Sequence, residues 1–298
     1  MIYDNILDTI GNTPLVRIHR LNPNPAVELL AKVEGFNPTG SIKDRIALRM
    51  VEQAEAEGVL TPDKIIIEAT SGNTGIGLAM IGAVRGYRVQ IVMSAAVSIE
   101  RQKMIQAFGS EIILTDPELG TDGAIVKVRE LVAAAPQRYW HPNQFSNQYN
   151  RLTHYKTTAE EIWEQTGGRV THFVSAIGTS GTLMGVGMML KESNPRIQII
   201  EAQPVKGHYI QGLKNLEEAI VPEIYDITQI DQCIMVETGE AYAMARRIVQ
   251  QEGIFVGMSS GAAMLAALRV VENLSTGVVV VILPDRGEKY LSTDLFQV

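Results

Sequence analysis

Short apolar runs alternate with amphipathic segments along almost the whole of this 298-residue chain. Several runs are rich in Ile and Val and apolar on both alternations, which is typical of strands buried on both faces. Several of the segments between them end at a glycine, where a helix C-terminus favours a left-handed residue. The alternation predicts an α/β fold with mostly parallel sheets. The expected strands are 29–33, 64–68, 88–93, 111–114, 171–176, 197–201 and 278–283, and the expected helices are 44–57, 76–84, 99–108, 158–165 and 262–271.

Composition narrows the class of protein. Apolar residues make up 46% of the chain and charged residues 20%, which is enough for a full core. A net charge of −7 without basic runs gives no reason to expect nucleic acid or a membrane surface as a partner. The only cysteine, Cys233, excludes an internal disulfide and a cysteine-based metal cluster. With no signal-peptide pattern and no apolar run near the roughly 18 residues of a membrane span, a cytoplasmic location is expected.

Three glycine-rich turns each follow an apolar run and lead into an expected helix. The turn Thr70-Ser71-Gly72-Asn73-Thr74-Gly75 carries three hydroxyls and no cation, which suits a carboxylate held by hydrogen bonds. The turn Gly178-Thr179-Ser180-Gly181-Thr182 matches neither a Walker A loop nor a dinucleotide fingerprint, and suits a small phosphate. In the third turn, 257–263, the serines could cap the helix, and one could face a ligand. One such turn alone would be interpreted as an ordinary connection between a strand and a helix, but three together favour binding sites.

Lys43 stands where a strand gives way to a helix, in the segment 37–45. A helix dipole disfavours a cation in the first turn, and the same field lowers the pKa of the amine, as imine formation requires. On this context alone, a reactive amine and a solvated surface lysine are equally supported. The five histidines show no metal-site spacing, so no metal is expected, and no Gly-x-Ser-x-Gly elbow indicates a hydrolase.

Together these segments resemble the cysteine synthases (O-acetylserine sulfhydrylases), pyridoxal phosphate (PLP) enzymes of fold-type II with a tryptophan synthase β-like fold. The similarity runs from 10–15 to 286–293, and the segment 38–45 is more similar to the B-type branch. The resemblance implies that Lys43 forms the Schiff base with PLP and acts as acid and base at Cα. It also implies that Asn73 binds the ring oxygen, that Ser259 faces the pyridine nitrogen, that Gly178, Thr179, Ser180, Gly181 and Thr182 hold the phosphate, and that Thr70, Ser71, Thr74 and Gln144 hold the substrate carboxylate.

The resemblance implies conversion of O-acetyl-L-serine and sulfide to L-cysteine and acetate via an aminoacrylate. A neutral Ser259 beside the pyridine makes the ring a weaker electron sink, which favours loss of a β-leaving group. Lys206 and Lys214 leave the donor open: either they are solvated, or Lys214 binds an anionic donor such as O-phosphoserine. Thiosulfate or a carrier-protein thiocarboxylate could also supply the sulfur. Cystathionine β-synthase, a cysteine lyase and a non-enzymatic PLP-binding regulator are the alternative functions.

The resemblance further implies two three-layer α/β domains with PLP between them. The N-terminal domain would comprise 1–12 and 35–147, and the C-terminal domain 13–34 and 148–298. A part of the first domain, about 89–133, would move to close over the substrate. A homodimer is the expected assembly, with small-molecule substrates as the other partners.

Overall fold

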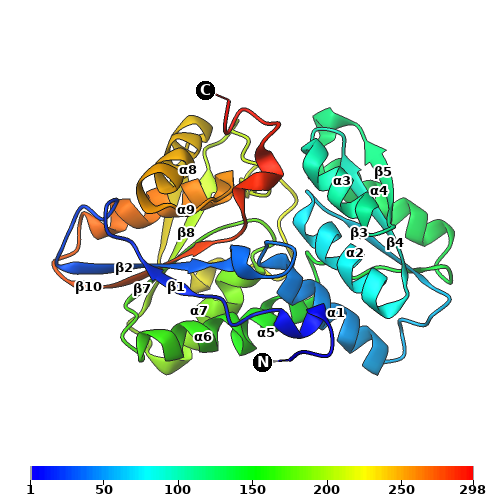
Figure 1. The fold of residues 1–298 in the computed structure, drawn as a ribbon, viewed down its shortest axis with the longest axis horizontal. Coiled ribbons are helices and arrows are strands. Elements are labelled where there is room, and N and C mark those ends of the chain that lie inside the picture. Colours follow the sequence, from blue (N-terminus) through cyan, green and yellow to red (C-terminus); the bar gives the residue numbers. More distant parts are fainter. Residues whose placement is uncertain (1, 298) are drawn as a thin grey trace.

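The computed structural model describes residues 2–297, which form two halves, each with its own sheet (Figure 1). Helices cover both faces of each sheet, and nearly all strand pairs are parallel. The predicted α/β class with mostly parallel sheets is therefore confirmed. Within the described residues, no helix is both long and apolar enough to cross a bilayer.

The larger sheet has six strands in the order β1-β2-β10-β7-β8-β9. Only β1 runs antiparallel to its neighbour among these described strands. Alternate side chains of β10 enter opposite layers: Val279 and Val281 pack under α8 and α9, and Val280 and Ile282 pack under α6 and α7. The bounds are β1 Leu15–Arg17, β2 Val27–Val33, β7 His172–Ala176, β8 Gln198–Pro204, β9 Gln232–Val236, β10 Gly277–Leu283, α6 Thr158–Thr166, α7 Gly181–Ser193, α8 Thr238–Glu252 and α9 Met258–Val271.

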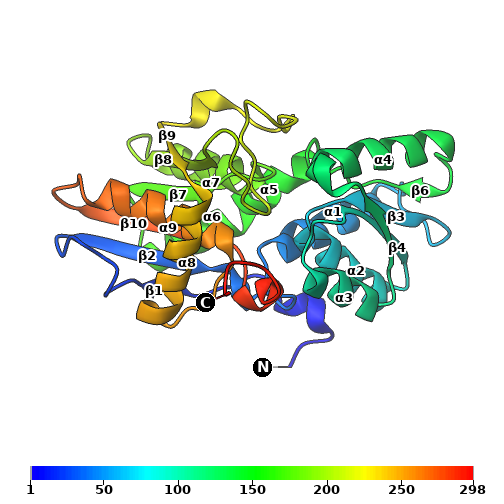
Figure 2. The ribbon, with the colours of Figure 1, turned by 90° about the horizontal axis from the view of Figure 1, so that it is seen from above.

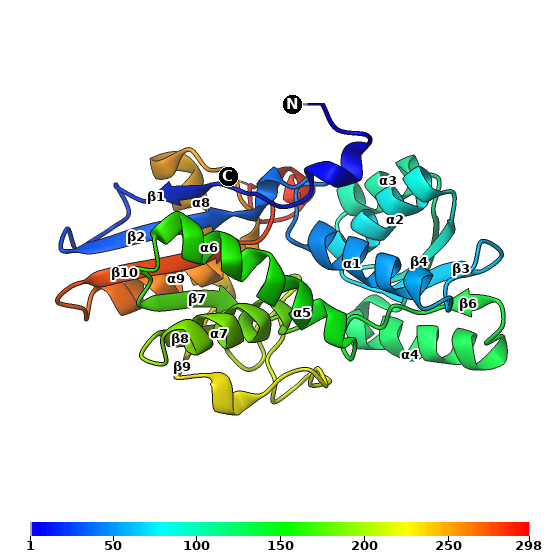
Figure 3. The same cartoon turned by 90° about the horizontal axis from the view of Figure 1, so that it is seen from below.

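The smaller sheet has four parallel strands in the order β5-β4-β3-β6. Its two faces carry different helices: α1, α2 and α3 pack on one, and α4 packs on the other (Figure 2). Helix α5 passes from this half to the other and contacts both α1 and α7 (Figure 3). The bounds are β3 Ile65–Ala69, β4 Arg88–Ser94, β5 Glu111–Thr115, β6 Tyr139–Trp140, α1 Lys43–Ala56, α2 Asn73–Arg85, α3 Ile99–Ala107, α4 Gly120–Ala134 and α5 Gln148–Lys156.

Each predicted strand and helix is present, with bounds that shift by a few residues. The largest shift is at α9, which begins at Met258 rather than at 262. Strands β1 and β6 have three and two residues, too few to show a period in the sequence. Helix α5 also escapes notice, because its buried residues are the polar Asn150, Thr153 and His154. The prediction also leaves out β9, α4 and α8, although the buried residues of α8 are all apolar, so apolar periodicity located only part of the core.

The two halves meet beyond the carboxyl ends of β3, β7 and β10. Loops from these three strands line one common pocket. The start of α1 is tied to the end of β10, because Ile42 N–H donates to the Pro284 carbonyl at 2.9 Å and Ser41 forms a bridge with Asp285. The pocket thus joins residues that are far apart in the sequence.

Candidate active site

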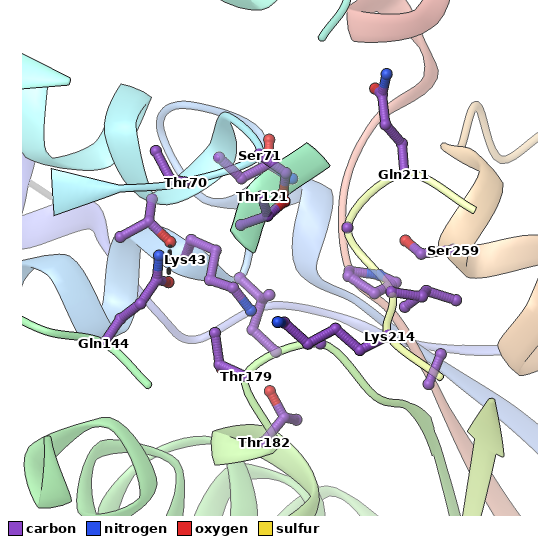
Figure 4. Close-up of a pocket in the computed structure, with 18 of the residues that line it drawn as sticks. Lys43, Thr70, Ser71, Thr121, Gln144, Thr179, Thr182, Gln211, Lys214 and Ser259 are labelled. Carbon is purple, nitrogen blue, oxygen red and sulfur yellow. Dashed lines mark hydrogen bonds between the residues drawn. The ribbon is translucent and has the colours of Figure 1, made fainter. Parts of the chain in front are cut away.

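The pocket between the halves contains most of the residues singled out from the sequence (Figure 4). Ser180 and Gly181 belong to the second glycine-rich turn without being among the lining residues. Gly178, Thr179 and Thr182 line the pocket from the same turn. The other predicted residues that line it are Lys43, Thr70, Ser71, Asn73, Thr74, Gln144, Lys214 and Ser259.

Lys43 is the first residue of α1, as predicted, and its half-buried side chain lines the pocket. Burial lowers the pKa of its amine to about 8, while the negative charges of Asp285 and Glu34 oppose the shift. The lowered pKa was expected, but its main physical cause is burial rather than the helix dipole. None of the described hydrogen bonds or ion pairs occupies the Lys43 amine, which leaves it available to a ligand.

The turn 70–75 forms the first anion cup. Gly72 has a φ of 132°, which only glycine adopts easily, and its N–H donates to Thr70 Oγ1 at 3.0 Å. No side chain caps α2, so its first-turn N–H groups can serve an anion. Gln144 closes the cup: Thr74 donates to its Oε1 at 2.6 Å, and its Nε2 donates to the Ala69 carbonyl at 2.8 Å.

The turn 178–182 forms the second anion cup, and its polar atoms fit a phosphate. Ser180 is buried with a left-handed φ of 67°, and its hydroxyl has no hydrogen-bond partner among the described residues. No side chain caps α7, which begins one residue later. Buried hydroxyls and helix N–H groups without partners are costly, and an anion with several acceptor oxygens would satisfy them.

The pocket wall near α9 differs from one expectation. The helix N-cap is Gly257, and no side chain makes a capping bond, so the prediction that a serine caps the helix is wrong. Ser259 instead lies in the first turn, where it is 7% exposed and lines the pocket. Asn73, which also lines the pocket, is held in one orientation: its Nδ2 donates to Asp285 at 2.7 Å, and its Oδ1 accepts from Lys289 at 2.9 Å.

Arg101 of α3 is a pocket residue that sequence reasoning missed. It is 1% exposed, donates to the backbone carbonyl of Ser71 at 3.2 Å and lies 3.5 Å from the Asp285 carboxylate. Further bonds join it to Gln211 and to the hydroxyl of Tyr290. Nothing in the sequence distinguishes Arg101 from the exposed lysine two residues later, because only the fold brings α3 against the first cup.

Lys214 is a buried, paired lysine rather than a solvated one. It is 8% exposed, and its Nζ donates to Asp122 of α4 at 2.7 Å and to the Ile220 carbonyl at 3.2 Å. The same ammonium lies 5.1 Å from the centre of the Phe145 ring. Lys206, the other lysine considered for this role, is exposed. The pocket therefore holds one of the two lysines, already neutralised by a carboxylate.

A lysine with a lowered pKa beside a phosphate-sized cup is the arrangement that pyridoxal phosphate requires, and comparison with known proteins agrees. The family model described as "Pyridoxal-phosphate dependent enzyme" matches residues 6–285. The chain therefore belongs to the pyridoxal-phosphate dependent enzymes, and PLP is its cofactor.

Within that family the chain groups with the cysteine synthases. A cysteine synthase of Aquifex aeolicus is 50% identical, over 98% of this chain and 92% of the relative. A cysteine synthase B of Pseudomonas aeruginosa is 44% identical, over 99% and 98%. The crystal structure of a cysteine synthase from Entamoeba histolytica superposes with a TM-score of 0.93 at 44% identity, covering 100% of this chain and 92% of the other.

Proposed function

We propose that the protein makes L-cysteine and acetate from O-acetyl-L-serine and sulfide, with Lys43 as the group that carries the proton at Cα. The observation that carries the proposal is the position of the Lys43 amine, which has a lowered pKa and lines the same pocket as two glycine-rich anion cups. The relatives named cysteine synthase support the same reaction.

Bound PLP supplies a conjugated ring that withdraws electrons and so stabilises negative charge at the substrate Cα. Lys43 lies at the pocket wall, and none of the described residues binds its amine, so the amine could both hold the cofactor and move a proton to and from Cα. A pKa of about 8 allows a substantial neutral fraction near neutral pH, which proton removal requires.

The two cups give the substrate and cofactor a fixed relative position. The cup 70–75 with Gln144 would hold the α-carboxylate through hydroxyls and N–H groups, and the cup 178–182 would hold the phosphate. Asn73 and Ser259 would contact the ring. The Asp285 and Lys289 contacts fix the Asn73 amide, which leaves one N–H of Nδ2 for a ring oxygen.

The charges in the pocket support a donor whose ester group is uncharged before it leaves. Lys214 is already paired with Asp122, and Arg101 is paired with Asp285. Neither cation is therefore left over for the two negative charges of a phosphate ester. This pairing favours O-acetylserine over O-phosphoserine as the donor.

The test uses purified protein with O-acetylserine and sulfide. Lys43→Ala should remove both the visible Schiff-base absorbance and cysteine formation. Lys103→Ala, which changes an exposed lysine on α3, is the matched control and should leave both unchanged. Full activity of Lys43→Ala would sink the proposal. A panel of donors and sulfur nucleophiles, ranked by kcat/KM, identifies the preferred substrates. A comparison of sulfide consumption with O-acetylserine and sulfide release from cysteine separates a synthase from a lyase.

We also propose a cytoplasmic homodimer. A cavity of about 310 Å³ opens between α1 and α5, lined by Leu48 and Leu152 and edged by Arg49, Glu52 and Lys156. A lining that combines apolar side chains with charges of both signs suits contact with a second copy. Leu152→Glu should give a monomer in sedimentation analysis, and an unchanged dimer would contradict this face. A fold that needs no disulfide suits a reducing compartment, which cell fractionation tests.

The domain division is likewise proposed: 1–12 with 35–147, and 13–34 with 148–298, the part 89–133 moving to close the pocket. Polar contacts join that part to the other half, among them Arg101 to Gln211, Asp122 to Lys214 and Glu100 to Ser292. Substrate-dependent protection of 89–133 in hydrogen exchange would support the movement, and equal exchange with and without substrate would contradict it.

A further inference from the structure

Helix α5 presents two buried polar side chains to the second anion cup. Asn150 and His154 are four residues apart, lie on one helix face and are both 0% exposed. Their face packs tightly on the start of α7, where a Cβ on Gly181 would collide with Asn150 Oδ1. Neither side chain has a role in the function proposed above, and buried polar groups of this kind need an explanation.

Each of the two side chains contacts one threonine hydroxyl of the cup. Asn150 Nδ2 donates to Thr179 Oγ1 at 3.1 Å and to the Gln144 carbonyl at 2.7 Å. His154 Nε2 lies 3.3 Å from Thr182 Oγ1, and its Nδ1 lies 2.9 Å from Thr158 Oγ1. Both threonines of the second cup are thus held from behind by a nitrogen of α5.

The direction of each hydrogen bond decides whether the threonine hydroxyl presents its proton or its lone pairs to an anion. A hydroxyl has one proton, so one that accepts an N–H from behind keeps that proton for a ligand in front. One that donates backwards would turn its lone pairs toward the anion and repel it. The amide nitrogen of Asn150 can only donate, so Thr179 has the favourable direction.

For His154, the tautomer of the ring decides whether the Thr182 hydroxyl accepts or donates the hydrogen bond between them. Burial, together with the charges of Lys43 and Arg45, holds the pKa of His154 well below 6.5, so the ring carries a single proton. With that proton on Nε2, the ring donates to Thr182, and Nδ1 accepts from the hydroxyl of Thr158. With the proton on Nδ1, Thr182 would have to donate backwards.

We propose that Asn150 and His154 are positioning residues that turn the hydroxyl protons of Thr179 and Thr182 toward the anion, with His154 as the Nε2–H tautomer. The inference rests on the proposed function, in which this cup takes the phosphate of PLP. Because the same Asn150 amide also holds the backbone of Gln144, it ties the phosphate cup to the residue that closes the carboxylate cup.

The test compares two cofactor forms on full-length protein stripped of PLP: PLP itself, and pyridoxal, which lacks the phosphate. His154→Leu should weaken PLP binding about tenfold or more and leave pyridoxal binding unchanged, because only the phosphate senses the hydroxyl direction. His154→Gln supplies an amide N–H near the position of Nε2 and should restore most of the PLP affinity. Equal losses for both ligands would mean a merely structural role and would overturn the proposal.

The variant Thr182→Val distinguishes a failure of this inference from a failure of the proposed phosphate binding by the turn 178–182. If Thr182→Val weakens PLP relative to pyridoxal and His154→Leu does not, the positioning role fails and the phosphate cup stands. If Thr182→Val leaves the ratio unchanged, the phosphate assignment itself fails. Nitrogen-15 NMR of the unsubstituted holoenzyme gives a test that does not depend on whether a variant folds. A proton on Nε2 of His154 is expected, and a proton on Nδ1 would overturn the proposal.

Discussion

The pH dependence of cofactor capture should report the buried position of Lys43. Imine formation needs the neutral amine, and a pKa of about 8 leaves roughly one tenth of it neutral at pH 7. An ordinary lysine, with a pKa near 10.4, would be about 0.04% neutral at that pH, roughly 200-fold less. Because the shift is downward, capture should be fast at neutral pH, rise about fivefold between pH 7 and 8, and level off above about pH 9.

The assay follows the visible absorbance after PLP is added to protein stripped of cofactor. The same reaction with Nα-acetyl-lysine provides a reference that divides out the titrations of PLP itself. Asp285 is the strongest of the charges that oppose the shift, so Asp285→Asn should move the midpoint to lower pH. A normalised rate that keeps rising tenfold per unit through pH 9.5 would refute the reasoning, since it would mean an unperturbed lysine.

Three further changes test the surroundings of the site. Asp122→Asn should free Lys214 and raise kcat/KM for O-phosphoserine relative to O-acetylserine about tenfold, a gain that adding Lys214→Ala should abolish; no change in the ratio would show that the pair does not set donor charge. Gly181→Ala places a Cβ in collision with Asn150 Oδ1, so the free energy of unfolding in urea should fall by about 1–3 kcal/mol, and an unchanged midpoint would contradict the close packing. Arg101→Met should raise KM for O-acetylserine while PLP affinity stays unchanged, because the guanidinium holds the first cup rather than the second; equal losses in both would contradict that assignment.

Much of the site could be predicted because its parts are local in the sequence. The turns 70–75 and 178–182 carry their hydroxyls and glycines within a few residues, and Lys43 stands at the start of its own helix. Such patterns follow from backbone chemistry that one segment specifies. The position of Lys43 was predicted, but its surroundings were not, because burial of the amine depends on residues some 240 positions away at the end of β10.

The residues that sequence reasoning missed act through contacts between distant segments. Arg101 of α3 meets Ser71 when α3 packs within the smaller half, and it meets Tyr290 only after the two halves pack together. His154 was one of five histidines without metal spacing, and its contact with Thr182 depends on the packing of α5 against α7. The (i, i+4) spacing of Asn150 and His154 would have been a signal only if a helix had been predicted there, and the polar composition of α5 concealed it.

The pairing of β2 with β10 has a consequence for how the chain matures. Strand Val27–Val33 lies between the short β1 and Gly277–Leu283, and the register pairs Val27 with Gly277, about 250 residues further along the chain. During synthesis, β2 therefore cannot pair fully until β10 has been made. The smaller sheet, in contrast, is complete within residues 65–140. Because the backbone just before Lys43 is also fixed by Pro284, a nascent chain cannot complete the surroundings of its reactive lysine before residue 284 has been synthesised. Loading with cofactor would then follow the synthesis of β10 rather than the synthesis of Lys43 itself.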